Sequence, residues 1–297
     1  MRRLLWLGLA VGLAAGAEVR LESNVIYGMY SGLALLLDVY HPEKPNGYGV
    51  VFISGSGWHA PLAWSARPLK ESGQEEVYAR PLAAAGYTVF AINHRAAPRF
   101  HYPAAVEDAQ RAARFARHNA RRFGIRPDRI GAVGGSSGGH LVLMLGLLDG
   151  KGDPEDPDPV SRESAKVQCV VARAAPADLA GMGPGGGGAP VSFLGVGPGR
   201  NADPKSVEAR TFREASPVTH VSADDPPILL MHGDRDETVP FQQSENMEKA
   251  LRGAGVTTRL LRVPGGGHGP TFAGAVNPPD YIGEMIRWLG EHLGGGA

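Results

Sequence analysis

The sequence predicts an α/β fold in which a mostly parallel sheet of about eight strands is covered by helices on both faces. Two observations lead to this prediction. Short β-branched and aromatic runs alternate along the 297 residues with longer amphipathic segments. Glycine-rich or polar loops follow several of the short runs, as expected where parallel strands end at one edge of a sheet. No internal repeat breaks the alternation, so residues 18–297 are interpreted as one domain.

The expected strands are apolar segments bounded by turn residues. Residues 49–53 are the clearest of them, because valine, isoleucine and phenylalanine fill every position after the glycine. Prolines mark other limits, since His41-Pro42 closes one strand and Pro226-Pro227 leads into another. The predicted strands are 18–26, 33–40, 49–53, 87–92, 129–133, 167–173, 228–231 and 257–263.

The expected helices have apolar positions at three- and four-residue spacing and end at glycines. The longest begins at Pro103, which suits a first helical turn, and ends before Gly124. The predicted helices are 74–85, 103–123, an apolar helix that contains 141–148, 241–252 and 280–293. The segment 175–217 is expected to be irregular because it is rich in glycine, so that 177–211 forms a small loop-rich lid at most.

The charge balance argues against nucleic acid as a partner. Lysine plus arginine and aspartate plus glutamate both number 30, so the formal net charge is zero. The arginines along 103–123 are therefore interpreted as a solvated helix face. The single cysteine, Cys169, excludes an internal disulfide and is expected to be a buried, inert thiol.

The first 17 residues have the pattern of a secretory signal. Arg2 and Arg3 precede the apolar run 4–15, and Ala15-Gly16-Ala17 offers small residues to a signal peptidase. The run is short for a membrane span. We predict cleavage after Ala17, a secreted or periplasmic protein and no stable membrane anchoring afterwards; the alternatives are an uncleaved anchor or an apolar first segment.

The segment 134–140 has the composition of a sharp strand-to-helix turn that carries a nucleophile. It reads Gly-Gly-Ser-Ser-Gly-Gly-His and follows a predicted strand. Gly135 and Gly139 flank Ser137 in the G-x-S-x-G pattern. Small residues suit this turn because it strains the backbone and brings strand and helix close together. We therefore predict that Ser137 is the nucleophile and that His140 packs or caps rather than acting as a base.

Two later loops carry what a nucleophilic serine requires. The hydroxyl needs a base to take its proton, and an acid that fixes the tautomer of that base. Asp234 and Asp236 follow the strand 228–231, and His268 lies among glycines after the strand 257–263. His268 is the predicted base, whereas His232 ends its strand and is expected to satisfy backbone groups locally.

Together these motifs resemble the α/β-hydrolase esterase/lipase group that includes acetyl esterases, acetylxylan esterases and bacterial feruloyl-esterase-like enzymes. The resemblance covers nearly all of the chain after the signal and includes the order serine, acid, histidine. The matching segments are 93–95, 103–108, 126–130, 135–141, 215–218 and 232–236. The resemblance implies that Asp236, three residues after Gly233 and three before Val239, is the triad acid, and that Asp234 shapes the turn.

The oxyanion loop departs from this family. The family carries His-Gly-Gly-Gly-Trp after the third strand, and this chain has Ser54-Gly55-Ser56-Gly57-Trp58. The donors in such a site are backbone amides, so a serine at position 56 does not remove the function. We predict that the amides of Ser56, Gly57 and Gly138 form the oxyanion hole.

The sequence thus predicts a serine carboxylesterase that acts on esters of short-chain acids and needs no metal or organic cofactor. Small-molecule esters and polysaccharide esters, such as acetylated xylan, are the expected substrates. The alternatives are a prolyl-oligopeptidase-type peptidase, a feruloyl- or lipase-like esterase for larger acyl groups, and a non-catalytic binding protein. The intact serine, aspartate and histidine argue against the last of these.

Four aromatic or imidazole side chains on loops near the expected site are candidates for substrate binding. Trp58, Trp64, His101 and Tyr102 follow predicted strands and offer rings that stack on a sugar or a phenolic acyl group. The alternative is that they pack beneath these loops. The oligomeric state is not readable from the sequence.

Overall fold

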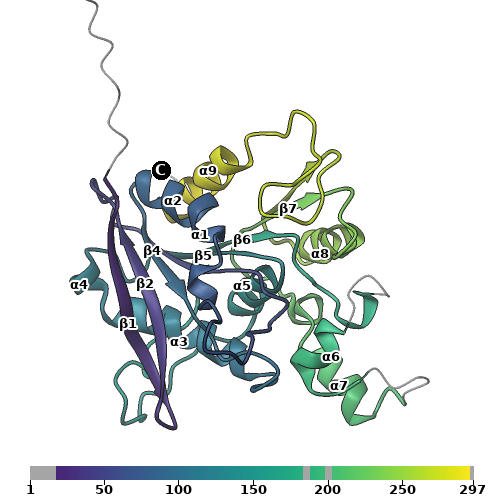
Figure 1. Cartoon of the computed structure of the whole chain (residues 1–297), viewed down its shortest axis with the longest axis horizontal. Helices are drawn as coiled ribbons and strands as arrows, with labels where there is room; N and C mark the ends of the chain where they lie inside the picture. The colour runs from purple at the N-terminus through teal and green to yellow at the C-terminus, as the bar shows by residue number, and fades with distance from the viewer. Residues whose placement is uncertain (1–17, 183–187, 198–202, 295–297) are drawn as a thin grey trace, which may run out of the picture.

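An eight-stranded sheet forms the centre of the computed structural model, which describes residues 18–182, 188–197 and 203–294 (Figure 1). The predicted signal peptide, 1–17, and parts of the predicted loop 177–211 lie outside the described residues. The strands are β1 (Arg20–Tyr30), β2 (Leu33–His41), β3 (Gly49–Ile53), β4 (Thr88–Ile92), β5 (Ile130–Gly135), β6 (Cys169–Arg173), β7 (Ile228–Gly233) and β8 (Thr258–Val263).

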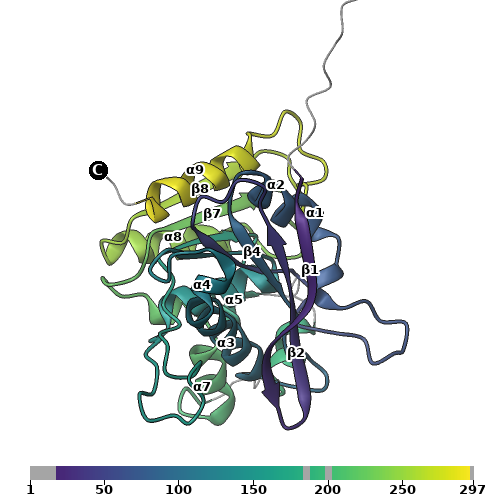
Figure 2. The same ribbon diagram turned by 90° about the vertical axis from the view of Figure 1, so that its left-hand side faces the viewer.

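The sheet is mostly parallel, which confirms the predicted fold class. Its strand order is β1-β2-β4-β3-β5-β6-β7-β8. The first two strands form an antiparallel hairpin at one edge, visible in Figure 2, and β2 pairs antiparallel with β4. All pairings from β4 to β8 are parallel. The carboxyl ends of β3 to β8 therefore meet at one edge of the sheet.

Helices cover both faces of this sheet, and each face has its own apolar core (Figure 1). One face packs against α3 (Ala104–His118), α4 (Ala120–Phe123), α5 (Ser137–Leu147) and α8 (Gln242–Gly253). The opposite face packs against α2 (Ala79–Ala84) and α9 (Tyr281–Leu293). Alternate residues of β3 point to the two cores, as a pleated strand requires.

Two predicted helices are interrupted, one close to a proline and one at an asparagine. The helix expected at 74–85 forms as α1 (Gln74–Val77) and α2, because Pro81 has no amide hydrogen to donate to the carbonyl of Val77. The helix expected at 103–123 ends at His118 and resumes as α4. At the break, the carbonyl of Phe115 accepts both the backbone amide of Asn119, at 3.0 Å, and its side-chain amide, at 2.9 Å.

The segment between β6 and β7 is more ordered than predicted. Its described parts contain the 3-10 turn η2 (Ala180–Met182), α6 (Ala189–Leu194), α7 (Val207–Glu214) and the turn η4 (Pro217–His220). Phe193 and Phe212 are buried in the core, so apolar anchors attach both short helices to the domain. The expectation of an irregular 175–217 was wrong for these parts, because two buried rings outweigh the surrounding glycines.

Two further findings bear on the expectations from the sequence. Cys169 is buried as predicted, and burial raises the pKa of its thiol. Within the described ranges, none of the helices combines the length and apolarity needed to cross a bilayer.

Candidate active site

The strand-to-helix elbow is centred on Ser136, not on Ser137. Ser136 lies between the last residue of β5 and the first of α5, with φ 55° and ψ −125°, the strained backbone of a nucleophile elbow. In a motif centred on Ser136, the flanking glycines are Gly134, two residues before the serine, and Gly138, two residues after it. A Cβ atom on Gly138 would collide with the carbonyl of Ile53, and one on Gly134 with the carbonyl of Gly138. The G-x-S-x-G pattern therefore spans 134–138.

The prediction that Ser137 is the nucleophile was wrong, because its side chain faces another part of the site. Ser137 is buried, and its Oγ accepts a hydrogen bond from the amide of Ser56 at 2.8 Å. The run of two glycines, two serines and two glycines fits the motif in two registers one residue apart. Strand β5 continues to Gly135, beyond the predicted end at 133, and this places the elbow at Ser136.

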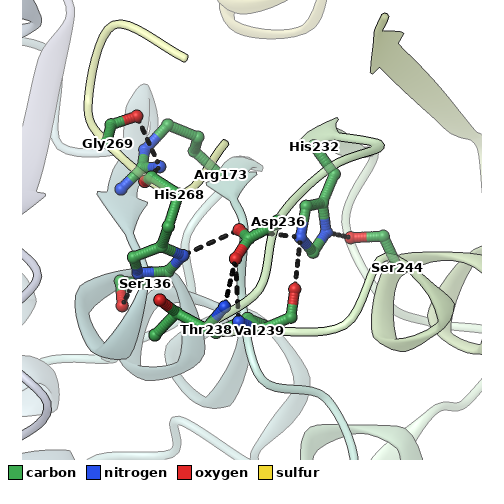
Figure 3. Close-up of polar contacts among 9 residues, drawn as sticks. All are labelled: Ser136, Arg173, His232, Asp236, Thr238, Val239, Ser244, His268 and Gly269. Carbon is green, nitrogen blue, oxygen red and sulfur yellow. Dashed lines mark hydrogen bonds and ion pairs between the residues drawn. The ribbon is translucent and has the colours of Figure 1, made fainter. Parts of the chain in front are cut away.

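His268 joins the elbow serine to the predicted acid (Figure 3). Its Nε2 lies 2.8 Å from Ser136 Oγ, and its Nδ1 lies 2.7 Å from Asp236 Oδ2. The carboxylate only accepts, so Nδ1 carries the proton and Nε2 is free to accept the serine hydroxyl hydrogen. His268 and Asp236 are thus brought together as the sequence predicted, but with Ser136 as their partner.

Asp236 is held as a carboxylate by donors on both of its oxygens. The amides of Thr238 and Val239 each donate to Oδ1 at 2.9 Å. Burial alone would raise the pKa of Asp236, but the hydrogen bonds from His232, His268 and Val239 outweigh it and hold the pKa well below its ordinary value. The acid therefore stays ionised and keeps His268 in one tautomer.

His232 and Ser244 support this acid and were missed by sequence reasoning. His232 is fully buried, and its Nε2 lies 3.2 Å from Asp236 Oδ2 and 3.0 Å from the carbonyl of Val239. Because both neighbours are acceptors, Nε2 carries the proton, and Nδ1 accepts the hydroxyl hydrogen of Ser244 at 2.7 Å. The expected backbone contact of His232 is present. The sequence contains one signal of the contact between His232 and Asp236, because the two residues lie four apart across a tight loop.

Asp234 shapes the adjoining turn, as the resemblance implied. Its Oδ1 accepts the amide of Gly265 at 2.7 Å, and its Oδ2 lies 2.9 Å from Arg262 Nε. The hydrogen bond from the amide of Gly265 is the main cause that lowers the pKa of Asp234; desolvation opposes it, and the hydrogen bond and charge of Arg262 lower the pKa further. Asp234 thus ties the loop after β7 to the end of β8 and to the start of the loop that carries His268.

The oxyanion loop differs in detail from the prediction. The amide of Ser56 is engaged by Ser137 Oγ, and the amide of Gly55 donates to Gln74 Oε1 at 3.0 Å. With the elbow at Ser136, the amide that follows the nucleophile is that of Ser137 rather than that of Gly138. The amides of Gly57 and Ser137 have no acceptor among the described residues and are available to an oxyanion; the amide of Gly138 is also without one, but it lies one residue further from the elbow serine.

Trp58 is a packing residue, so its predicted role in substrate binding was wrong. Its ring is 2% exposed, stacks on Phe193 with centroids 4.8 Å apart, and donates from Nε1 to His140 Nδ1 at 3.1 Å. His140 also donates from Nε2 to the carbonyl of Ala215 at 2.8 Å. Burial lowers the pKa of His140 to about 4, so it is neutral and packs as predicted.

The other three candidates for substrate binding differ in exposure. Trp64 is fully exposed on the loop after β3. His101 is exposed, with Nδ1 2.8 Å from the carbonyl of Ser192, and the half-buried Tyr102 donates its hydroxyl hydrogen to the carbonyl of Glu214 at 3.0 Å. His101 and Tyr102 thus attach the segment of α6 and α7 to the domain, and substrate roles for Trp64, His101 and Tyr102 stay predictions.

Across the described parts of the chain, no group of three or more histidine, cysteine or carboxylate residues is arranged to hold a metal ion.

The sheet order, the elbow and the serine–histidine–aspartate chain define the α/β-hydrolase class. Within that class the chain belongs to the BD-FAE family, whose model matches residues 37–251. It is 31% identical over 254 residues to Esterase LipC of Mycobacterium tuberculosis, a match that covers 83% of this chain. The chain spans only 52–59% of the length of the first curated relatives.

Two solved structures are similar over most of their length. A truncated carbohydrate esterase from gut microbiota is 29% identical, with a TM-score of 0.76, covering 95% of this chain and 99% of that one. An acetyl ester-xyloside bifunctional hydrolase from Caldicellulosiruptor lactoaceticus is 26% identical, with a TM-score of 0.76, covering 95% and 98%.

Proposed function

We propose that this chain is a serine carboxylesterase that hydrolyses esters of short-chain acids. The observation that carries the proposal is the continuous hydrogen-bonded chain from Ser136 through His268 to Asp236, with separations of 2.8 and 2.7 Å. A base within hydrogen-bond reach of a strained serine, itself oriented by a carboxylate, is the arrangement that activates a hydroxyl for attack on a carbonyl. The esterase relatives support the same reaction class.

The first half-reaction forms an acyl-enzyme. Ser136 Oγ attacks the ester carbonyl carbon while His268 Nε2 takes the hydroxyl proton. The carbonyl oxygen becomes an oxyanion, and the amides of Gly57 and Ser137 donate to it. The tetrahedral intermediate collapses, the alcohol leaves with the proton from His268, and Ser136 carries the acyl group.

Water completes the cycle on the same residues. His268 takes a proton from a water molecule, whose oxygen attacks the acyl carbon, and the second intermediate releases the acid and returns the proton to Ser136. Asp236 stays ionised throughout and stabilises the imidazolium that forms twice in each cycle.

The substrate class proposed is acetyl or other short acyl groups on a carbohydrate. The two solved neighbours are named as a carbohydrate esterase and as an acetyl ester-xyloside bifunctional hydrolase. A series of p-nitrophenyl esters of rising acyl length, together with acetylated xylan, tests this choice. Hydrolysis of aminoacyl-nitroanilides at a rate comparable with that of acetyl esters would instead favour a peptidase. Export is proposed from residues 1–17 and is tested by sequencing the N-terminus of the protein recovered outside the cytoplasm.

The matched pair Ser136→Ala and Ser137→Ala tests the assignment of the nucleophile. We expect the first variant to lose turnover of p-nitrophenyl acetate and the second to keep most of it, because alanine at 137 retains the backbone amide. Both variants remove one hydroxyl from adjacent residues, so a difference between them reports the role of the hydroxyl. Full activity in Ser136→Ala would exclude the proposed mechanism.

A further inference from the structure

One buried cation next to the site takes no part in the proposed proton transfers. Arg173 is the last residue of β6 and is only 3% exposed. Its Nη1 donates to the carbonyl of His268 at 2.6 Å and lies 3.2 Å from the carbonyl of Gly269 (Figure 3). We propose that Arg173 is a positioning residue that holds the loop of the base in register with the elbow serine; this inference rests on the proposed esterase reaction.

The backbone of the same residue contacts the other side of the site. The amide of Ser136 donates to the carbonyl of Arg173 at 2.7 Å. The guanidinium lies against the elbow, because a Cβ atom on Gly135 would stand 2.8 Å from its Nε and Nη2 atoms. One residue thus bonds to the backbone of both Ser136 and His268, so its conformation sets the spacing between the nucleophile and the base.

The loop that carries His268 depends on such contacts because it is built from glycines. Gly265 to Gly267 precede His268 and Gly269 follows it, so few side chains anchor this stretch. Tyr78, at the junction of α1 and α2, donates its hydroxyl hydrogen to the carbonyl of Pro270. Together with Arg173 it holds the carbonyls of three consecutive residues, 268–270.

The charge of Arg173 is costly for the fold. Among the described residues no carboxylate lies within ion-pair distance of it, and its Nε has no hydrogen-bond acceptor. Burial lowers its pKa, but a guanidinium still remains charged at neutral pH. Replacing buried charged groups by apolar side chains of similar volume is often neutral for stability, and removing Arg173 leaves no ion-pair partner behind as an uncompensated charge. A structural role alone would be served by an apolar side chain of similar length, whereas positioning requires the donor.

The test compares Arg173→Met with Arg117→Met. Arg117 is a matched control because its guanidinium also donates to backbone carbonyls, those of Pro127, Ser164 and Lys166. These carbonyls precede β5 and β6, at the edge of the sheet opposite the site. We expect Arg173→Met to lower kcat for p-nitrophenyl acetate about 10- to 100-fold, the effect of one charged hydrogen bond. KM and the thermal midpoint should stay close to those of the wild type.

A second readout does not require ester turnover. The Nδ1 proton of His268, hydrogen-bonded to Asp236, is observable by NMR as a low-field resonance, and we expect it to shift or broaden in Arg173→Met and to stay unchanged in Arg117→Met. Unchanged kcat and an unchanged resonance in Arg173→Met would overturn the positioning role. An equal loss of kcat in both methionine variants would overturn it too. A wild-type protein that cleaves no ester would refute the proposed function, while the resonance would still test Arg173.

Two milder variants keep the proposal testable if Arg173→Met does not fold. Arg173→Lys retains a donor and should recover part of the lost kcat. Tyr78→Phe removes only the contact with Pro270 and should lower kcat by a smaller factor with the same change in the His268 resonance. Wild-type kcat in both variants, with an unchanged resonance, would contradict the proposal.

Discussion

Replacing His140 by glutamine should remove about 2 kcal/mol of the stability that this protein is expected to lose between pH 7 and pH 4.5. The imidazole of His140 is fully buried in α5, where Nδ1 accepts from Trp58 and Nε2 donates to Ala215. The bond from Trp58 requires the neutral ring, since a proton on Nδ1 would face the donor of Trp58, whereas Nε2 donates to Ala215 in either protonation state. Glutamine offers one acceptor and one donor group but does not titrate.

The magnitude follows from the difference between the two states of the chain. Burial lowers the pKa of His140 from 6.5 to about 4 in the folded protein. The unfolded chain therefore binds the proton first as the pH falls, so the free energy of unfolding is greatest above pH 6.5 and declines toward pH 4. Between pH 7 and pH 4.5 the loss from this one group is about 2 kcal/mol.

Urea unfolding at pH 7 and at pH 4.5 measures this change. The wild type should lose about 2 kcal/mol more between the two values than His140→Gln does. The exposed His59 provides the control, since His59→Gln should leave the wild-type difference unchanged. His94, whose pKa is also lowered by burial, accounts for part of the remaining dependence. Equal losses in wild type and His140→Gln would refute the argument, as would a native-state pKa of His140 near 6.5 measured by NMR.

Three substitutions test the rest of the site. Asp236→Asn should lower kcat by about 10³- to 10⁴-fold, measured on p-nitrophenyl acetate, because the amide favours the wrong tautomer of the base; a small loss would refute its role. His232→Leu removes a donor to Asp236 and should lower kcat about 10-fold, and a wild-type pH–rate profile would count against that support. Gly138→Ala places a Cβ against the carbonyls of Ile53 and Ser54 and should cost about 1–3 kcal/mol in denaturant unfolding; an unchanged midpoint would contradict the packing.

The sheet and the loops that carry the acid and the base were predictable because their signals are local. Each strand is a short apolar run with turn residues at its ends, and β3 and β7 stand out by composition alone. Asp236 and His268 follow such strands, so their convergence follows from the topology of a parallel sheet.

The register of the elbow was not predictable from spacing. Gly134 and Gly135 precede two serines that two further glycines follow, so either serine fits the motif. The choice depends on where β5 ends, and that end is set by pairing with β6, where Gly135 lies opposite Arg173. A shift of one residue changes the assigned nucleophile from Ser137 to Ser136, and the assigned oxyanion amide from that of Gly138 to that of Ser137.

The burial of Trp58 was also hidden from the sequence, because its partners are distant. Phe193 stacks on it from α6, and His140 accepts its Nε1 hydrogen from α5. An aromatic residue after a strand offers the same composition whether it stacks on a ligand or on another ring. Only the tertiary packing separates the two.

The assignment of Ser136 as the nucleophile is the central claim, and covalent labelling tests it most directly. The wild-type protein is treated with a fluorophosphonate, digested, and the modified peptide is sequenced by mass spectrometry. The geometry of Ser136 and His268 predicts one phosphonyl group on Ser136 Oγ and none after Ser136→Ala. A label on Ser137, or an ester-cleaving enzyme that takes up no label on Ser136, would contradict the account.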